Sequence, residues 1–171
     1  MPLVRAAIAI GTNLGDRAHL LHAAVDDLAA LPGTYLLAVS DAVETAALRV
    51  GVVEPGPAYL NAAVVVSTSL APRELLGCLH DIEAHHGRDR RAPRGSARTL
   101  DLDLLLFGNQ IIDDRPPHAE PSDRGGLIVP HPHLHERAFM LAPLAQIAPN
   151  WVVPGRSRSV AELLAALGPA T

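Results

Sequence analysis

Residues Arg98 to Gly108 read R-T-L-D-L-D-L-L-L-F-G, and this run decides both the fold and the chemistry. Leucines alternate with two aspartates, as expected for a strand whose successive side chains point to opposite faces. Asp101 and Asp103 therefore share one face, with Cα atoms roughly 6.5–7 Å apart. The pattern predicts that the alternating leucines of the run enter the core: Leu100, Leu102, Leu104 and Leu106.

Two carboxylates at this spacing repel each other unless a cation lies between them. Oxygen ligands on a rigid strand suit Mg²⁺, and a carboxylate pair can serve two Mg²⁺ ions about 3.5–4 Å apart. Paired Mg²⁺ ions indicate phosphate chemistry. The alternative is a strand with a solvated acidic face.

The segment just upstream, from Arg88 to Arg98, holds five of the fourteen basic residues of the chain. Its glycine, proline and serine predict a loop rather than a helix. Guanidinium groups bind phosphate oxygens in a bidentate manner and stay charged at any working pH. This loop and the two aspartates together predict a polyphosphate clamp, and the alternative is a basic loop that only solvates itself.

The 171 residues, 49% of them apolar, predict a single domain over residues 1–171. A net charge of −4 argues against a general nucleic-acid binder. The chain has no lysine, which excludes a P-loop of the Walker type and lysine-based covalent catalysis. No apolar run reaches about 18 residues and no leader pattern opens the chain, so we expect a cytoplasmic protein without a membrane span.

Hydrophobic patterning predicts alternating strands and helices, some strands being joined as hairpins. This mixture favours an α+β layered sandwich over a doubly wound parallel sheet. Beside the run quoted above, strands are expected at 4–10, 35–43, 59–67, 110–113, 127–129 and 151–153. Helices are expected at 17–31, 72–86, 135–147 and 160–167, and residues 11–15 are expected to form a turn.

Several other polar residues are candidates for a site. The run H-P-H-L-H contains His131, but Pro132 and the lack of a second ligand pair at a standard spacing argue against zinc. One of the histidines is expected to bind phosphate or nucleotide and the others to lie at the surface. Glu83 and His80 share a helix face, either near the site or as a solvated face. Asn61 and Tyr59 share one face of a strand, where the Asn61 amide would bind a heterocycle or an internal backbone group.

These motifs occur in an order that resembles a known family. I-A-I-G-T-N-L-G-D-R opens the chain, and Y-L-N-A-A-V, I-E-x-x-x-G-R, R-T-L-D-L-D-L-L-L-F-G, V-P-H-P and R-x-F-M-L-x-P-L follow. Over residues 4 to 154 the chain resembles the 6-hydroxymethyl-7,8-dihydropterin pyrophosphokinases of folate biosynthesis. The resemblance implies a ferredoxin-like α+β fold, a monomer, and transfer of pyrophosphate from ATP to the pterin hydroxymethyl group with release of AMP.

The resemblance also implies roles for individual residues. Two Mg²⁺ ions would be held by Asp101 and Asp103. The ATP site would comprise Glu83, Arg88, Arg90, Arg98, His131 and Arg137, with Arg98 closest to the transferred group. The pterin pocket would comprise Thr45, Leu48, Tyr59, Asn61 and Phe139, with Phe139 stacked on the ring. The chain departs from the family in the loop before the D-L-D strand, where Gly95 stands at a position often held by tryptophan.

One alternative function from another class is a ferredoxin-like module that binds nucleic acid through the arginine loop. With only 3% aromatic residues the chain offers few platforms on which bases could stack. A catalytically inactive relative acting as a scaffold is a further alternative, against which the intact Asp101, Asp103 and Arg98 argue.

Overall fold

The computed structural model describes residues 2–46, 57–88, 99–115 and 126–168 of the chain. The strands are β1 (Val4–Thr12), β2 (Thr34–Val39), β3 (Val43–Thr45), β4 (Tyr59–Thr68), β5 (Asp101–Phe107), β6 (Ile112–Asp113), β7 (Ile128–Val129), β8 (Val152–Val153) and β9 (Arg158–Ser159). The helices are α1 (Arg17–Ala29), α2 (Pro72–His85), α3 (Ala138–Ile147) and α4 (Val160–Ala166), with a 3₁₀ turn η1 (Leu134–Glu136) before α3.

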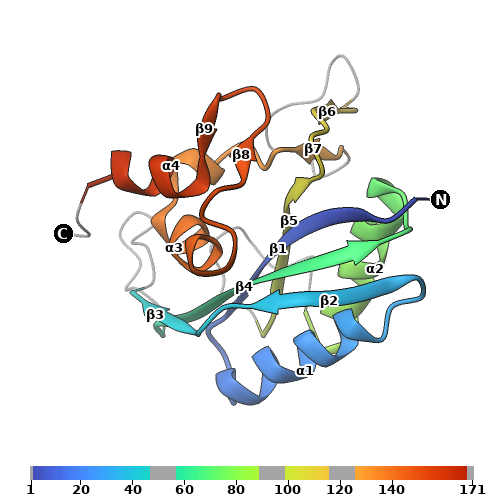
Figure 1. Cartoon of the computed structure of the whole chain (residues 1–171). Coiled ribbons are helices and arrows are strands. Elements are labelled where there is room, and N and C mark those ends of the chain that lie inside the picture. The colour runs from blue at the N-terminus through green and yellow to red at the C-terminus, as the bar shows by residue number, and fades with distance from the viewer. Residues whose placement is uncertain (1, 47–56, 89–98, 116–125, 169–171) are drawn as a thin grey trace.

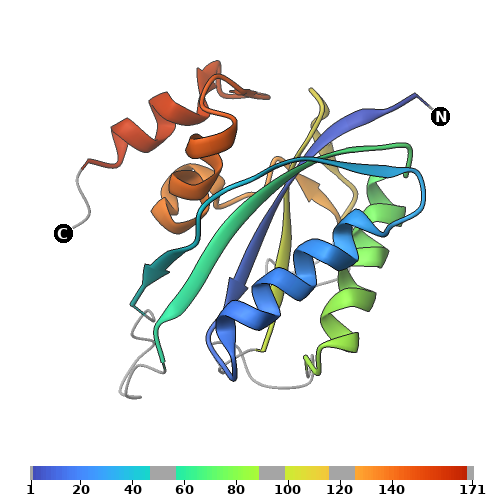
Figure 2. The same cartoon turned by 60° about the horizontal axis from the view of Figure 1, so that its bottom comes forward.

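The main sheet has the strand order β2-β4-β1-β5, and β3 pairs with the first residues of β4, from Tyr59 to Asn61. All of its pairings are antiparallel. Helices α1 and α2 cover one face and α3 and α4 cover the other, as Figures 1 and 2 show. The succession β1-α1-β2-β4-α2-β5 in this strand order is the ferredoxin-like α+β fold, so the predicted fold class is confirmed.

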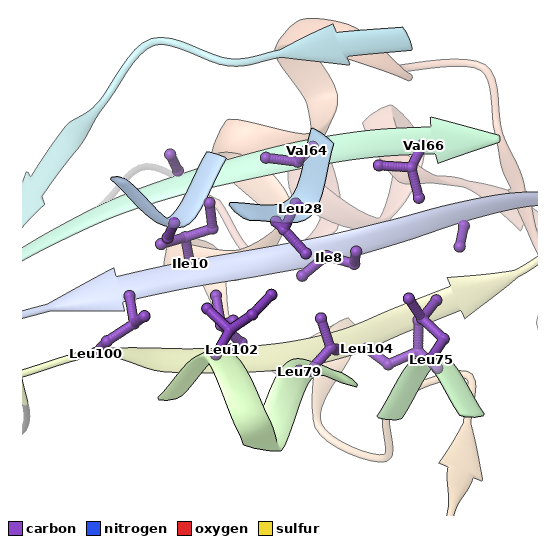
Figure 3. Packing of buried hydrophobic residues seen from close by; sticks show 14 of the residues in the cluster. Ile8, Ile10, Leu28, Val64, Val66, Leu75, Leu79, Leu100, Leu102 and Leu104 are labelled. Carbon is purple, nitrogen blue, oxygen red and sulfur yellow. The ribbon is translucent and has the colours of Figure 1, made fainter. Parts of the chain in front are cut away.

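The larger core lies between the sheet and helices α1 and α2. Alternate residues of β1, such as Ile8 and Ile10, and of β4, such as Val64 and Val66, point into it (Figure 3). Leu100, Leu102 and Leu104 lie in the same core, as the alternation predicted. Burying side chains of this kind contributes about 1.5–3 kcal/mol each, so the leucines fix the face of β5 on which the aspartates lie.

Leu106 is buried as predicted, but not in the core that holds the other three leucines. A bulge between Ala7 and Ile8 of β1 leaves Leu105 without an opposite residue, so Leu104 pairs with Ile8 and Leu106 pairs with Ala7. An extra residue in one strand reverses the alternation beyond it. Leu106 is therefore buried in the second core, which lies against α3 and α4.

Three predicted boundaries are also wrong. The strand expected at 35–43 is divided into β2 and β3 at Ser40, whose backbone N–H still donates to Ala63 O at 2.9 Å, whereas the N–H of Ala63 donates to the Ser40 Oγ at 2.8 Å in place of a backbone carbonyl. The helix expected at 135–147 starts at Ala138, because Arg137 is in an extended conformation (φ −116°) and occupies the cap position. The turn expected at 11–15 is shorter, since Gly11 and Thr12 belong to β1.

Candidate active site

The polar residues predicted for the site gather on the sheet face that α3 and α4 cover. Asn61 on β4 and Asp101 on β5 both lie opposite Gly11 of β1, and Asp103 lies opposite Ala9. Directly opposite residues of antiparallel strands point to the same face. The register therefore places the amide of β4 and the carboxylates of β5 on one surface, separated by the width of a single strand.

A buried ion cluster holds the first carboxylate. The guanidinium of Arg88, just after the end of α2, donates through Nη1 both to Glu83 Oε1 and to Asp101 Oδ1. The side chains of Arg88 and Asp101 are 11% and 20% exposed, so this charge is well shielded from solvent. One positive charge thus bridges two negative ones, which fixes Arg88 and Asp101 relative to α2.

Glu83 is fully buried, which contradicts the alternative of a solvated face for this residue. Its Oε1 also accepts the backbone N–H of Leu102 at 2.7 Å, between the two aspartates. A buried carboxylate is stable only when paired and hydrogen-bonded, and Glu83 meets both conditions. It ties helix α2 to the strand that carries the aspartates.

Asp103 lies in an environment that disfavours its charge. Burial, followed by the negative charges of Asp101 and Glu83, raises the pKa of Asp103 from an ordinary 3.8 to about 7, although the charges of Arg88 and Arg137 lower it in part. The side chain keeps 37% of its surface exposed, so solvent screens part of this effect. The pair therefore binds a proton readily, and a cation that replaced this proton would relieve the repulsion.

His131 faces the same carboxylate from the loop after β7, with Nε2 4.0 Å from Asp103 Oδ1. Burial, followed by the charges of Arg137 and His133, lowers the pKa of His131 from 6.5 to about 4, so the ring is neutral at pH 7. Its Nδ1 accepts the backbone N–H of His133 at 3.2 Å, which places the ring proton on Nε2. His131 thus offers a neutral donor towards the carboxylate pair, as suits a phosphate ligand.

Three of the five predicted pterin residues, Thr45, Tyr59 and Asn61, form a second cluster at the β3–β4 end of the surface. Thr45 lies opposite Tyr59, and the amide Nδ2 of Asn61 donates to Thr45 Oγ1 at 2.7 Å and to Val43 O at 3.4 Å. The internal backbone bond foreseen as the alternative for Asn61 is therefore present. Asn61 is only 5% exposed, so the bonds to β3 fix the direction of its amide oxygen.

Arg137 and Phe139 lie at the start of α3, the helix that packs on this face of the sheet. The guanidinium carbon of Arg137 lies 5.7 Å from the centroid of the Phe139 ring, and Phe139 is partly buried against the second core. The charge of Arg137 also lowers the pKa values of both Asp103 and His131, after larger effects. Arg137 is thus the cation that α3 contributes on the carboxylate side.

Of the remaining predicted residues, Leu48, Arg90 and Arg98 lie outside the described residues, as does Gly95. Sequence reasoning missed Gly11, because the G-T-N-L-G run was assigned to a turn. The register that brings Gly11 between Asn61 and Asp101 is a property of the sheet. The only signal of Gly11 in the sequence is its position directly after the apolar run at 4–10.

Asp101 and Asp103 supply the hard oxygen donors that Mg²⁺ binds. Within the described ranges no group of three or more His, Cys, Asp and Glu side chains is arranged to hold a metal ion. Mg²⁺ usually takes one or two protein carboxylates and completes its shell with water and phosphate, so two aspartates are a suitable donor set. The repulsion that raises the pKa of Asp103 is what such a cation would relieve.

The fold and the site define the class: a ferredoxin-like α+β protein with a carboxylate pair, an arginine bound to one of the carboxylates, and a buried amide on the same sheet face. Residues 7–149 match the model of the 7,8-dihydro-6-hydroxymethylpterin-pyrophosphokinase (HPPK) family, and the chain belongs to this family. The resemblance noted in the sequence is thereby confirmed.

Two bacterial relatives are each named 2-amino-4-hydroxy-6-hydroxymethyldihydropteridine pyrophosphokinase. The Pseudomonas aeruginosa protein is 40% identical over 162 residues, which are 95% of this chain and 91% of that protein. The Methylorubrum extorquens protein is 39% identical over 168 residues, covering 98% of this chain and 96% of that protein.

Among solved structures, an HPPK-DHPS in complex with substrates superposes with a TM-score of 0.74 at 14% identity, covering 96% of this chain. The wild-type Plasmodium falciparum HPPK-DHPS superposes with a TM-score of 0.69 at 13% identity, again over 96% of this chain. This chain spans 44% of the length of each of those two chains. At this identity the likeness supports the fold alone. Among the described residues no helix is long and apolar enough to cross a membrane.

Proposed function

We propose that this chain transfers pyrophosphate from ATP to the hydroxymethyl group of 6-hydroxymethyl-7,8-dihydropterin, in folate biosynthesis. Membership of the pyrophosphokinase family supports the proposal. The observation that carries it is the row of Asn61, Gly11 and Asp101 on one sheet face, along which a pterin held at Asn61 would meet phosphates held at Asp101. We also propose one domain over residues 1–171, acting as a cytoplasmic monomer. No observation favours the nucleic-acid-binding alternative.

In the proposed reaction the hydroxyl oxygen of the pterin attacks the β-phosphorus of ATP. The bond from the β-phosphorus to the oxygen bridging it to the α-phosphorus breaks, AMP leaves, and the hydroxyl proton is lost to solvent or to a nearby base. Asp101 and Asp103 would hold two Mg²⁺ ions, which when bound neutralise charge on the phosphates. Positioning and charge stabilisation are the main contributions expected of a protein in such a transfer.

Each polar residue then has a task. Arg88, held by Glu83, keeps the Asp101 carboxylate in place, and the neutral Nε2–H of His131 donates to a phosphate oxygen. Arg137 adds positive charge beside the phosphates, and Arg90 and Arg98 act from the segment that precedes β5. Asn61, Thr45 and Tyr59 hold the pterin edge while Phe139 and Leu48 cover its ring.

The test compares AMP production by wild type, Asp101→Asn, Asp103→Asn and the control Asp113→Asn. Asp113 is an aspartate paired with Arg115 on β6 and lies outside the proposed site. Either site variant is expected to lose at least 10²-fold in Mg²⁺-dependent turnover with an unchanged fold, whereas the control keeps its activity. Near-wild-type turnover in Asp101→Asn or Asp103→Asn would rule out the carboxylate pair as the metal site.

A further inference from the structure

Gly11 is the residue of the central strand β1 that separates the two halves of the site. It is the partner of Asn61 on β4 and of Asp101 on β5, so the three residues form one row across the sheet. Neighbouring strands lie about 4.7–4.9 Å apart, which puts Asn61 and Asp101 roughly 9.5 Å from each other. Any ligand that contacts both residues must cross over Gly11.

The backbone of Gly11 does not itself require glycine. Its φ lies outside the left-handed region, in contrast to Gly15 (φ +70°) and Gly33 (φ +62°). A Cβ built on Gly11 would lie 3.5 Å from Asn61 Oδ1 and 3.8 Å from Tyr59 Cδ1, which are ordinary van der Waals contacts. Glycine weakens a strand interior, and it occurs there where another group must approach the backbone closely.

The direction of the missing side chain connects Gly11 to the ligand. A Cβ on Gly11 would point to the same face as the amide of Asn61 and the carboxylate of Asp101. The next residue of β1 on that face is Ala9, which lies opposite Ala63 and Asp103, so small residues continue along the strand. Between the pterin end and the phosphate end, strand β1 itself therefore contributes only backbone and a methyl group to this face.

We propose that Gly11 is the floor of the passage through which the hydroxymethyl arm of the pterin reaches the β-phosphate, and that its missing side chain sets how closely the arm can approach. This inference rests on the proposed function. Reacting atoms must come within about 3–3.5 Å, and a displacement of 1 Å can lower a rate 10²-fold. A methyl group on Gly11 would lift the arm by more than that.

The experiment uses Gly11→Ala, with Gly77→Ala as the matched control. Gly77 lies on α2, its added Cβ would meet nothing within 4 Å, and it is no part of the proposed site. Pterin affinity is measured in the presence of a non-hydrolysable ATP analogue and Mg²⁺, and turnover is measured from AMP release. Gly11→Ala is expected to weaken binding of the hydroxymethyl pterin about tenfold and to lower kcat about 10²-fold.

Three further readouts separate this role from a purely structural one. The melting temperature of Gly11→Ala should equal or exceed that of wild type, because the Cβ fits. Affinity for the ATP analogue without pterin should change less than threefold. A pterin that lacks the 6-hydroxymethyl group should bind Gly11→Ala and wild type equally, since it has no group that passes over residue 11. Gly77→Ala should keep wild-type kinetics throughout.

The inference is overturned if Gly11→Ala keeps pterin affinity and kcat within threefold of wild type. It is also overturned if Gly11→Ala melts well below wild type. The same holds if Gly11→Ala loses affinity for the ATP analogue and for the pterin without the 6-hydroxymethyl group to the same extent as for the substrate. Failure of the proposed function has a different signature: wild-type protein would release no AMP from ATP and the hydroxymethyl pterin.

Discussion

Replacing Asp103 by asparagine should stabilise the metal-free protein, and more so as the pH rises. Burial and the charges of Asp101 and Glu83 raise the pKa of Asp103 from 3.8 to about 7. The folded protein therefore binds this proton more tightly than the unfolded chain does. Stability from this group is fully present below pH 4 and is lost as the pH rises through about 7. Asparagine has the same shape and never carries the charge.

The size of the effect follows from the pKa difference. Going from 3.8 to about 7 corresponds to about 4 kcal/mol, at 1.36 kcal/mol for each pKa unit. Because 37% of the side chain is exposed, screening by solvent reduces this to about 1–2 kcal/mol. Asp103→Asn should gain that much unfolding free energy at pH 8 and less at pH 5.

Urea denaturation of wild type and Asp103→Asn in EDTA, at pH 5, 6, 7 and 8, measures this difference. Asp113→Asn is the control, because its hydrogen bond to Arg115 lowers the pKa of Asp113. The effect of that control substitution should be the same at all four pH values, which lie above the titration of Asp113. A gain for Asp103→Asn that is equal at pH 5 and pH 8, or is absent, would refute the account of repulsion between the paired carboxylates.

Three further predictions concern the surroundings of the carboxylates. Glu83→Gln removes the charge of a fully buried partner of Arg88 and should lower the unfolding free energy, measured by urea denaturation, by about 2–3 kcal/mol. The control Glu44→Gln, in the partly exposed pair with Arg17, should lower it by less than about 1 kcal/mol. Equal losses of unfolding free energy would contradict a special role for Glu83. Because the pKa of His131 is lowered to about 4, its ring signals in NMR should stay those of a neutral imidazole from pH 8 to pH 5, and a midpoint near 6.5 would be incompatible with the burial described. Arg98→Ala should lower kcat by roughly 10²–10³ with little change in KM for ATP, as expected for a contact that strengthens in the transition state, and an effect limited to KM would make Arg98 a ground-state anchor.

The sequence allowed the class of fold, and the face of β5 on which the aspartates lie, to be predicted because both depend on local patterns. Alternation along β5 separates Leu100, Leu102 and Leu104 from Asp101 and Asp103, and the structure confirms this separation. The patterns for α1 and α2 were likewise sufficient to locate these helices, whose ends differ from the predicted ones by only one or two residues.

The errors have their origin in contacts between distant segments. The bulge that turns Leu106 to the other face is a mismatch between β1 and β5, and the interruption before β3 comes from the Ser40 hydroxyl bonding to Ala63. Likewise, Glu83 is buried because the N–H of Leu102 and the guanidinium of Arg88 meet it there. No periodicity in a single segment contains these partners, so Gly11, Glu83 and Leu106 acquire their roles only in the assembled sheet.

The central claim is that one sheet face binds a pterin and a phosphate donor and joins them. Its most direct test is the release of AMP from ATP by the purified chain, measured with and without Mg²⁺ and with and without 6-hydroxymethyl-7,8-dihydropterin. The account predicts that AMP and the pterin diphosphate form in equal amounts only when both Mg²⁺ and the pterin are present. AMP release that does not depend on the pterin, or release of ADP in place of AMP, would contradict it.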